Sequence, residues 1–307
     1  MGTSVQPERP GLRLRKRKNG RGTDRVGFRG RSQVSLFLFL GLLAVSTAAQ
    51  DLGSLSQQII SGNTEQKRDA LLRVRNLRSA EASRLAVPAL GDTDEIVRAT
   101  AAASVVFLSP TEAAGALLPL LSDKSTFVRK EAAYAMGAVG DPSAVSALTG
   151  LLNDKDLEVR SAAANAMGRI GDPAATNALL SILQRSPNED TEFVRRSAAR
   201  SIGQIAEFAL TGRHVELTPQ NFLPERYKVI LPVDYAKTAR FPDAGALLLR
   251  VFQNKRESED TRREAAFALG SLRYLPAKSA LSAGLNSDDR VLVEICKEAL
   301  LKLAAVE

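Results

Sequence analysis

The chain of 307 residues contains one histidine, His214, the side-chain type that most readily exchanges a proton near neutral pH. Catalysis by a histidine needs a positioned partner, such as a nucleophilic serine with a carboxylate behind the ring. His214 is flanked by Arg213 and Val215, and we find no serine–histidine–aspartate arrangement, no glycine-rich phosphate loop and no metal-ligand spacing. We therefore expect no catalytic residues, no metal site and no cofactor.

A second set of residues recurs at a fixed interval and is able to form ion pairs. The set comprises the arginines Arg98, Arg129, Arg160, Arg195 and Arg262 and the aspartates Asp92, Asp123 and Asp154. The first three arginines are 31 residues apart, each aspartate stands six residues before one of them, and extrapolation by 31 reaches Lys67 and Val293. Guanidinium and carboxylate groups pair bidentately, so the spacing predicts a structural ladder of Arg–Asp contacts between neighbouring units. The alternative is a row of anion-binding arginines.

These arginines lie in a longer repeat, which indicates the elements that position them. "VRSAAANAMGRIGDPAATNALLSIL" (159–183) has a near copy 31 residues earlier, "VRKEAAYAMGAVGDPSAVSALTGLL". Apolar residues at three- and four-residue steps predict two helices in each unit. Asp154 or Asp156 caps the first helix and Gly171 ends it, while Asp172 and Pro173 begin the second. A fixed period of this length predicts stacked supersecondary units.

The alanines of the first helices are small enough to let neighbouring helices approach closely, and stacking provides the core that one unit lacks. The pattern "D…VRxxAAxAMGxxGDPxA" resembles HEAT repeats, specifically the HEAT-like repeats named after phycobilisome lyases, over residues 51–307 apart from one insertion. The resemblance implies an all-α fold, a right-handed α-α superhelix (a HEAT/ARM-like solenoid) of about seven helix-pair repeats, whose second helices line a concave surface. Members of the family are mostly protein-binding scaffolds, with some enzymes among them.

The repeat is interrupted by an insertion at about 210–241. The proline that opens the second helix stands 13 residues after the arginine in two intact units, but Pro242 stands 47 residues after Arg195. Long insertions on a rigid scaffold are often functional. The candidate partner-binding residues in it are His214, Phe222, Tyr227, Tyr235 and Phe241. The alternative is a lobe whose aromatic residues pack over the stack.

The positive charge of the chain is confined to its first 50 residues. These carry ten Lys or Arg against two acidic residues, and the remaining 257 residues carry 32 of each sign. A neutral body without tryptophan argues against nucleic-acid binding. The apolar run "VSLFLFLGLLAV" (34–45) after the basic stretch predicts a signal peptide over 1–49, cleaved after Ala49. The alternative is an uncleaved anchor, the only expected membrane contact.

The sequence thus favours an exported, periplasmic or extracellular protein whose mature part is the solenoid of residues 50–307. We expect a non-enzymatic scaffold that binds a protein partner through the concave face and the insertion. Metal-dependent HEAT-like hydroxylases need several histidines, and this chain has one. The alternative is a lyase-like or chaperone-like accessory related to the phycobilin lyases.

Overall fold

The chain divides into two units, residues 1–49 and 50–307. The computed structural model describes residues 51–214, 219, 224 and 241–306. The predicted leader and most of the insertion, including Phe222, Tyr227 and Tyr235, lie outside the described residues. Among the helices that are described, none combines the length and the apolar character that crossing a membrane requires.

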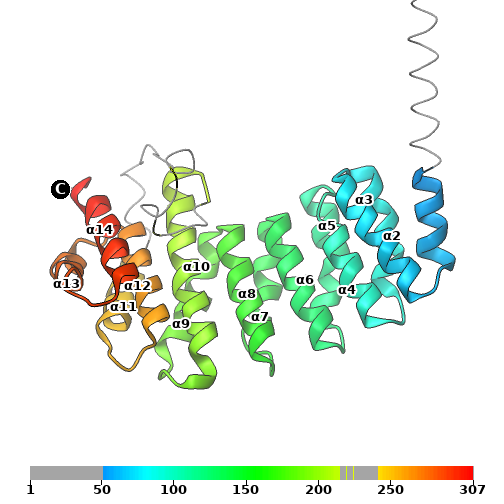
Figure 1. Ribbon diagram of the computed structural model, residues 1–307. Coiled ribbons are helices and arrows are strands. Elements are labelled where there is room, and N and C mark those ends of the chain that lie inside the picture. Colours follow the sequence, from blue (N-terminus) through cyan, green and yellow to red (C-terminus); the bar gives the residue numbers. More distant parts are fainter. Residues whose placement is uncertain (1–50, 215–218, 220–223, 225–240, 307) are drawn as a thin grey trace, which may run out of the picture. The chain divides into compact units, whose positions relative to one another are not determined.

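The described part of the second unit is an all-α solenoid of seven helix pairs, as expected, and no strand occurs in it (Figure 1). One helix of each pair carries the repeated arginine or its equivalent, and together these form the arginine layer: α2 (Thr64–Leu77), α4 (Glu95–Ser104), α6 (Thr126–Val139), α8 (Leu157–Ile170), α10 (Glu192–Thr211), α12 (Glu259–Ser271) and α14 (Arg290–Ala304). The other helices form the leucine layer: the segment 51–61, α3 (Ala80–Ala86), α5 (Pro110–Leu117), α7 (Val145–Leu151), α9 (Thr176–Gln184), α11 (Pro242–Gln253) and α13 (Lys278–Gly284).

The helix boundaries follow the predicted capping residues. Asp156 caps α8 by accepting hydrogen bonds from two backbone amides, and Gly171 ends the same helix with φ 76°, a left-handed conformation that favours glycine. Asp172 accepts the amide of Ala174, with Pro173 in the first turn. The structure adds one feature: this proline opens a short 3₁₀ turn, η4 (Pro173–Ala175), before α9 begins.

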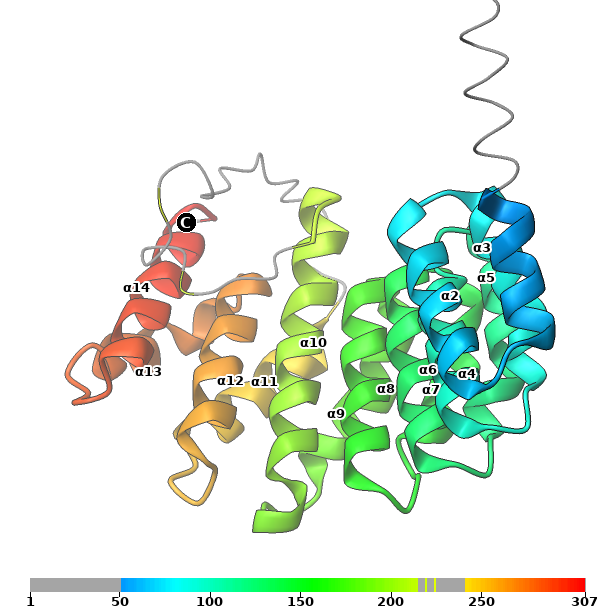
Figure 2. The same ribbon diagram turned by 45° about the vertical axis from the view of Figure 1, so that its right-hand side comes forward.

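The arginine layer is the tightly packed one. Its helices lie side by side from α4 to α14 (Figure 2). A Cβ added at Gly137 of α6 would meet the Cα of Ala166 in α8 at 2.8 Å, and one added at Gly270 of α12 would meet the Cα of Ala299 in α14 at 2.6 Å. Both glycines stand eight residues after the repeated arginine, so the repeat itself provides these close approaches.

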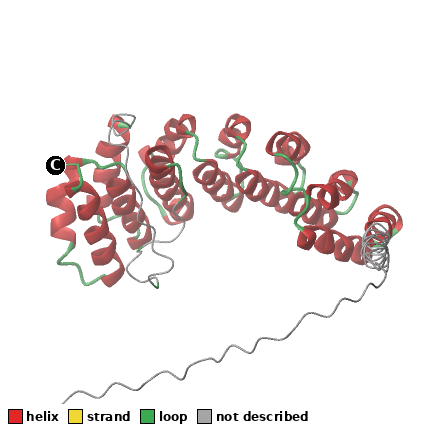
Figure 3. Cartoon of the chain, turned by 90° about the horizontal axis from the view of Figure 1, so that it is seen from above, coloured by secondary structure: helices red, strands yellow, loops and turns green. Residues whose placement is uncertain are grey.

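The concave face therefore belongs to the arginine layer. In a curved stack, the layer whose helices lie closer together is on the inside of the bend, and Figure 3 shows the described stack of the second unit curving. The expectation that the second, leucine-rich helices line the concave surface was wrong. Glycine and alanine crowd the first helices together, whereas the leucine side chains of the second helices hold those apart.

The core runs between the two layers. Three alanines of α6 (Ala132, Ala133 and Ala135) and the alanines of α8 are buried, as are Leu179, Leu180 and Leu183 of α9. Cys296 of α14 is fully buried, and burial raises the pKa of its thiol to about 12. This thiol is a small packing residue.

Candidate functional site

The repeated arginines pair with carboxylates of the following unit. Arg98 donates from Nε and Nη2 to the two carboxylate oxygens of Asp123, both at 2.8 Å, and Arg129 donates in the same way to Asp154, at 2.8 and 2.9 Å. The partner lies 25 residues ahead, rather than six behind. Lys67 takes the arginine's place in the first contact, with its Nζ 2.6 Å from Asp92 Oδ2.

The backbone carbonyl of each aspartate also accepts a hydrogen bond from the arginine six residues later. The carbonyl of Asp92 accepts from Arg98 Nη1 at 2.9 Å, and the carbonyl of Asp123 accepts from Arg129 Nη1 at 2.9 Å. Burial by itself would raise the pKa of Asp123, but hydrogen bonds from Arg98 and from the Ser125 amide outweigh it and lower that pKa. We call one arginine, its carboxylate ahead and its carbonyl behind a rung of the ladder.

The ladder changes at the end of α9. Arg160 keeps the contact behind, from Nη1 to the Asp154 carbonyl at 2.7 Å, but has no carboxylate partner within the described residues. Arg195 reaches Glu257, which lies 62 residues ahead and beyond the insertion, and both side chains are 2% exposed. Arg262 donates to the Phe252 carbonyl at 3.0 Å.

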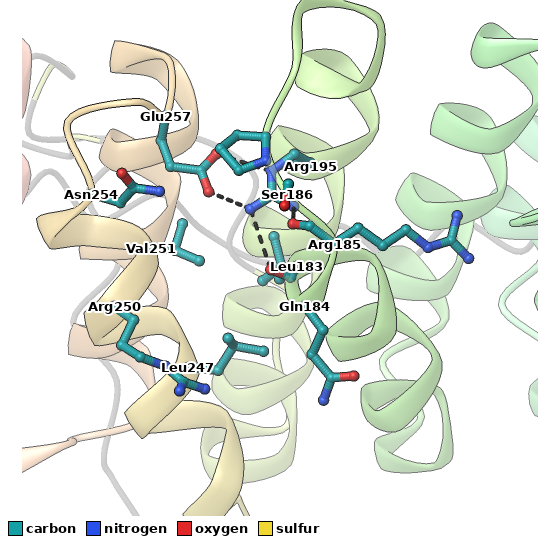
Figure 4. Close-up of a pocket in the computed structure, with 11 residues that line it drawn as sticks. Leu183, Gln184, Arg185, Ser186, Arg195, Leu247, Arg250, Val251, Asn254 and Glu257 are labelled. Atoms are coloured by element: carbon teal, nitrogen blue, oxygen red, sulfur yellow. Dashed lines mark hydrogen bonds and ion pairs between the residues drawn. The ribbon is translucent and has the colours of Figure 1, made fainter.

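A cavity of about 300 Å³ lies beside the pair formed by Arg195 and Glu257, where α9 meets α11 (Figure 4). Arg195 stands between Glu257 and the last carbonyls of α9, while Leu247 and Val251 of α11 face the cavity. The buried ion pair is complete, because the guanidinium also donates to three backbone carbonyls. The pair joins the two sides of the insertion and acts as a structural bridge.

The predicted partner-binding residues divide between the described and undescribed parts of the insertion. His214 is exposed and stacks on Phe208 of α10, with the ring centroids 4.3 Å apart. Phe241 is 8% exposed and belongs to the core, which favours a packing role. The helix α10 extends to Thr211, so its last turn occupies the start of the segment expected as a loop.

The concave face carries a polar pocket that the sequence did not indicate. Its cavity of about 310 Å³ is lined by Asn165 of α8, by Arg196, Ser197 and Arg200 of α10, and by Asp260 and Glu264 of α12. Arg196 pairs with Asp260, and Arg200 pairs with Glu264, each at 2.9 Å. These pairs cross from one helix to the next, so they depend on packing rather than on spacing within one helix.

Glu264 is only half satisfied in this pocket. Its Oε1 accepts the hydrogen bond from Arg200, while its Oε2 is buried without a hydrogen-bond partner among the described residues. Burial raises the pKa of this carboxyl, partly offset by Arg200. A buried oxygen without a donor is costly, so Oε2 is the least satisfied atom of this pocket.

Helices α6 and α10 of the arginine layer also carry exposed aromatic side chains. Phe127 and Tyr134 of α6 and Phe193 of α10 are 42%, 43% and 58% exposed. Lys130 lies 5.7 Å from the Phe127 ring centroid, and Arg196 lies 5.3 Å from that of Phe193. Phe127 and Phe193 both stand two residues before the ladder arginine, so they occupy equivalent places on their helices.

A buried cluster of three charged side chains links α10 to the C-terminal helices of the arginine layer. Glu207 of α10 accepts from Arg273 at 2.9 Å and from Lys302 of α14. Burial by itself would raise the pKa of Glu207, but the two cations lower it. Sequence reasoning missed this cluster, because its members are 66 and 95 residues apart. It ties α10 to the last helix pairs.

The described residues contain no group of three or more His, Cys, Asp and Glu side chains placed to hold a metal ion. Apart from Arg160 and Arg262, the charged groups described above pair with one another inside the ladder, the bridge and the cluster. The polar pocket and the exposed aromatic side chains both lie on helices of the arginine layer.

Residues 83–157 and 114–203 match HEAT repeats. No curated protein matches the chain. Among solved structures, an engineered protein is 20% identical with a TM-score of 0.49, over 82% of this chain and 68% of that one. Human deoxyhypusine hydroxylase in complex with glycerol is 17% identical with a TM-score of 0.38, over 86% and 99%. The complex of CpcE and CpcF of phycocyanin lyase from Nostoc sp. PCC7120 is 24% identical with a TM-score of 0.38, over 73% and 91%. The chain thus contains HEAT repeats over residues 83–203, within an all-α solenoid of stacked helix pairs.

Proposed function

We propose that this protein is a non-enzymatic scaffold that binds a protein partner through the concave face of the arginine layer, between α6 and α12. The observation that carries the proposal is the half-satisfied Glu264 in an open polar pocket, with exposed rings of Tyr134 and Phe193 on the same face. Aromatic anchors beside polar groups are typical of protein-binding surfaces. HEAT repeats are typical protein-interaction modules.

The proposal also gives a role to the insertion, in partner binding, and to the leader, in export. His214, stacked at the end of α10, marks the start of the insertion, which we propose contributes to partner binding. The basic and apolar pattern of residues 1–49 supports export to the periplasm or the outside of the cell. No observation on the described residues favours the lyase-like or chaperone-like alternative.

Site-specific photo-crosslinking in the full chain tests the binding face. A benzophenone amino acid replaces Tyr134 or Phe193 on the concave face, and Leu118 or Leu275 as exposed controls outside the arginine layer. We expect one crosslinked protein from both concave positions and none from the controls. A partner captured only at the control positions would overturn the concave-face proposal.

A second arm addresses the insertion and the pocket separately. Replacing residues 215–240 by a short Gly-Ser linker is expected to weaken partner capture without changing helix content by circular dichroism. Glu264→Gln is expected to weaken capture, because the carboxylate becomes a weaker acceptor. The matched control is Glu131→Gln, at the equivalent place on α6, two residues after its ladder arginine. Equal capture by all variants would remove both elements from the binding surface.

A further inference from the structure

The rung at Arg160 keeps the contact behind and lacks the carboxylate pair ahead. The second carbonyl contacts, from Arg98 to Thr93 and from Arg129 to Lys124, also have no counterpart there among the described residues. In all three, the arginine Nη1 donates to the carbonyl six residues behind, at 2.9, 2.9 and 2.7 Å for Arg98, Arg129 and Arg160. This shared contact holds the three guanidinium groups by the same nitrogen. In the first two, Nε and Nη2 then bind a carboxylate ahead. At Arg160, the same two nitrogens have no partner within the described residues.

The residue that stands in the place of the ladder carboxylate is Arg185. It lies 25 residues after Arg160, the interval that separates Arg98 from Asp123 and Arg129 from Asp154. Its backbone also does what a ladder aspartate does, since its carbonyl accepts from Nη1 of the next arginine, Arg195. Its side chain turns instead to Asn153, with Nη2 3.1 Å from Oδ1. A cation therefore occupies the structural place of an anion.

A small cavity lies at this rung. It measures about 100 Å³ and is lined by Arg160, Ile182, Arg185, Thr191 and Val194. This volume suits a carboxylate head group, and two of the five lining residues are arginines beside a mostly apolar wall. The carboxylates of the two neighbouring rungs are already engaged, since Asp154 pairs with Arg129 and Glu257 pairs with Arg195.

The energetic setting favours a carboxylate at this place. Arg160 is half-buried in the cleft between α8 and α10, so an ion pair formed there is screened less than one at the open surface. Its orientation is fixed beforehand by the Asp154 carbonyl, which reduces the entropy lost on binding. In the two preceding rungs, the Nε and Nη2 atoms of the arginine bind a carboxylate bidentately, so the same two atoms of Arg160 are suited to a carboxylate.

We propose that Arg160 and Arg185 form a binding site for a carboxylate supplied by another molecule, which completes the ladder at this rung. The carboxylate comes either from an Asp or Glu side chain of a partner polypeptide or from a free small carboxylate. The site lies at the ends of α8, α9 and α10, and its function does not require binding at the Glu264 pocket.

The test follows the arginine Nε–Hε resonances of the full chain by NMR during titration. The probes are sodium acetate, the peptide Ac-Gly-Asp-Gly-NH₂ and its Asn counterpart, with sodium chloride at equal ionic strength as the salt control. We expect acetate and the Asp peptide to move the Arg160 resonance saturably toward the positions of Arg98 and Arg129. The Asn peptide and sodium chloride should leave it in place. Saturation by the Asp peptide at a concentration at least tenfold below that of acetate would assign the site to a partner side chain, and equal concentrations would assign it to a free carboxylate.

Two variants at one position provide the matched control. Arg185→Asp supplies the ladder carboxylate from the chain itself, so the Arg160 resonance should start at its bound position and no longer respond to acetate. Arg185→Asn removes the same cation without adding a charge, and the response should persist, shifted to a several-fold higher acetate concentration. A free-protein Arg160 resonance already at the bound position, or no saturable response to either carboxylate, would overturn the proposal. So would an Arg185→Asp variant that folds and still binds acetate.

Discussion

Replacing Arg129 by Gln removes one complete rung and leaves a carboxylate without its guanidinium. Arg129 donates twice to Asp154 and once to the Asp123 carbonyl, and the two paired side chains are 9% and 10% exposed. Removing one partner of a buried ion pair costs about 3–5 kcal/mol. Asp154 keeps the hydrogen bond from the Asp156 amide and some contact with water, so we expect a loss of about 2–3 kcal/mol in the free energy of unfolding.

The matched control is Arg160→Gln, which changes the same residue type at the next rung. Within the described residues, Arg160 loses one hydrogen bond, to the Asp154 carbonyl, and no carboxylate is stranded. We expect a loss of about 1 kcal/mol. The difference between the two variants measures mainly the contribution of the carboxylate pair. Among the residues that the structure describes, Arg129 otherwise has only two long additional contacts, at 3.4 Å to the Lys124 carbonyl and to Thr126 Oγ1.

The assay is urea unfolding of the full chain, followed by circular dichroism. Stacked repeats need not unfold in a single step, so amide hydrogen exchange in α6 and α8 provides a local measurement beside it. Arg129→Gln should lower protection at the interface of these two helices well before distant repeats are affected. Equal losses for the two variants would show that the ladder carboxylates add nothing to stability, and the structural account of the ladder would fail.

Three further predictions follow from packing and titration. Gly137→Ala forces a Cβ to within 2.8 Å of Ala166 and should cost about 1–3 kcal/mol in urea unfolding, whereas Gly150→Ala, with nothing within 4 Å, should be neutral or stabilise by about 0.5–1 kcal/mol. Cys296 should resist DTNB at pH 8 in the native chain and react after unfolding, because its pKa is about 12 and its side chain is buried; rapid native labelling would contradict this. The lowered pKa of Asp123 means that its stabilisation is present above its ordinary pKa, near 4, and is lost as pH falls through the folded value. Stability should therefore fall below about pH 4, and Asp123→Asn should flatten that decline.

Most of the fold was predictable, because the units repeat the residues that begin and end their helices. Caps such as Asp156 and Gly171 act through neighbouring backbone groups, so their effect is local and visible in the sequence. The 31-residue interval likewise indicated contacts between units. It left their direction open, and only packing shows that Arg98 pairs with the carboxylate of Asp123 ahead, while Asp92 behind accepts through its backbone carbonyl.

The candidate binding site was much less predictable. The Glu264 pocket joins α8, α10 and α12, and its members are separated by the insertion, so no spacing connects them. The expected aromatic residues of the insertion were chosen by composition, and of these Phe241 is buried in the core. The one signal that would have pointed to the concave face is the glycine eight residues after four of the repeated arginines, Arg129, Arg160, Arg195 and Arg262. It marks the layer in which helices approach most closely.

The sequence by itself determined the helix pairs, their number and the residues that end them, because those depend on neighbours along the chain. It also contained the irregular rung, since Arg185 stands where the interval requires a carboxylate. The tertiary structure decided which layer faces inward, which arginine bridges the insertion to Glu257, and which carboxylate oxygen is left without a donor. These depend on how closely helices distant in sequence approach, a quantity fixed by the packing of side chains from several units at once.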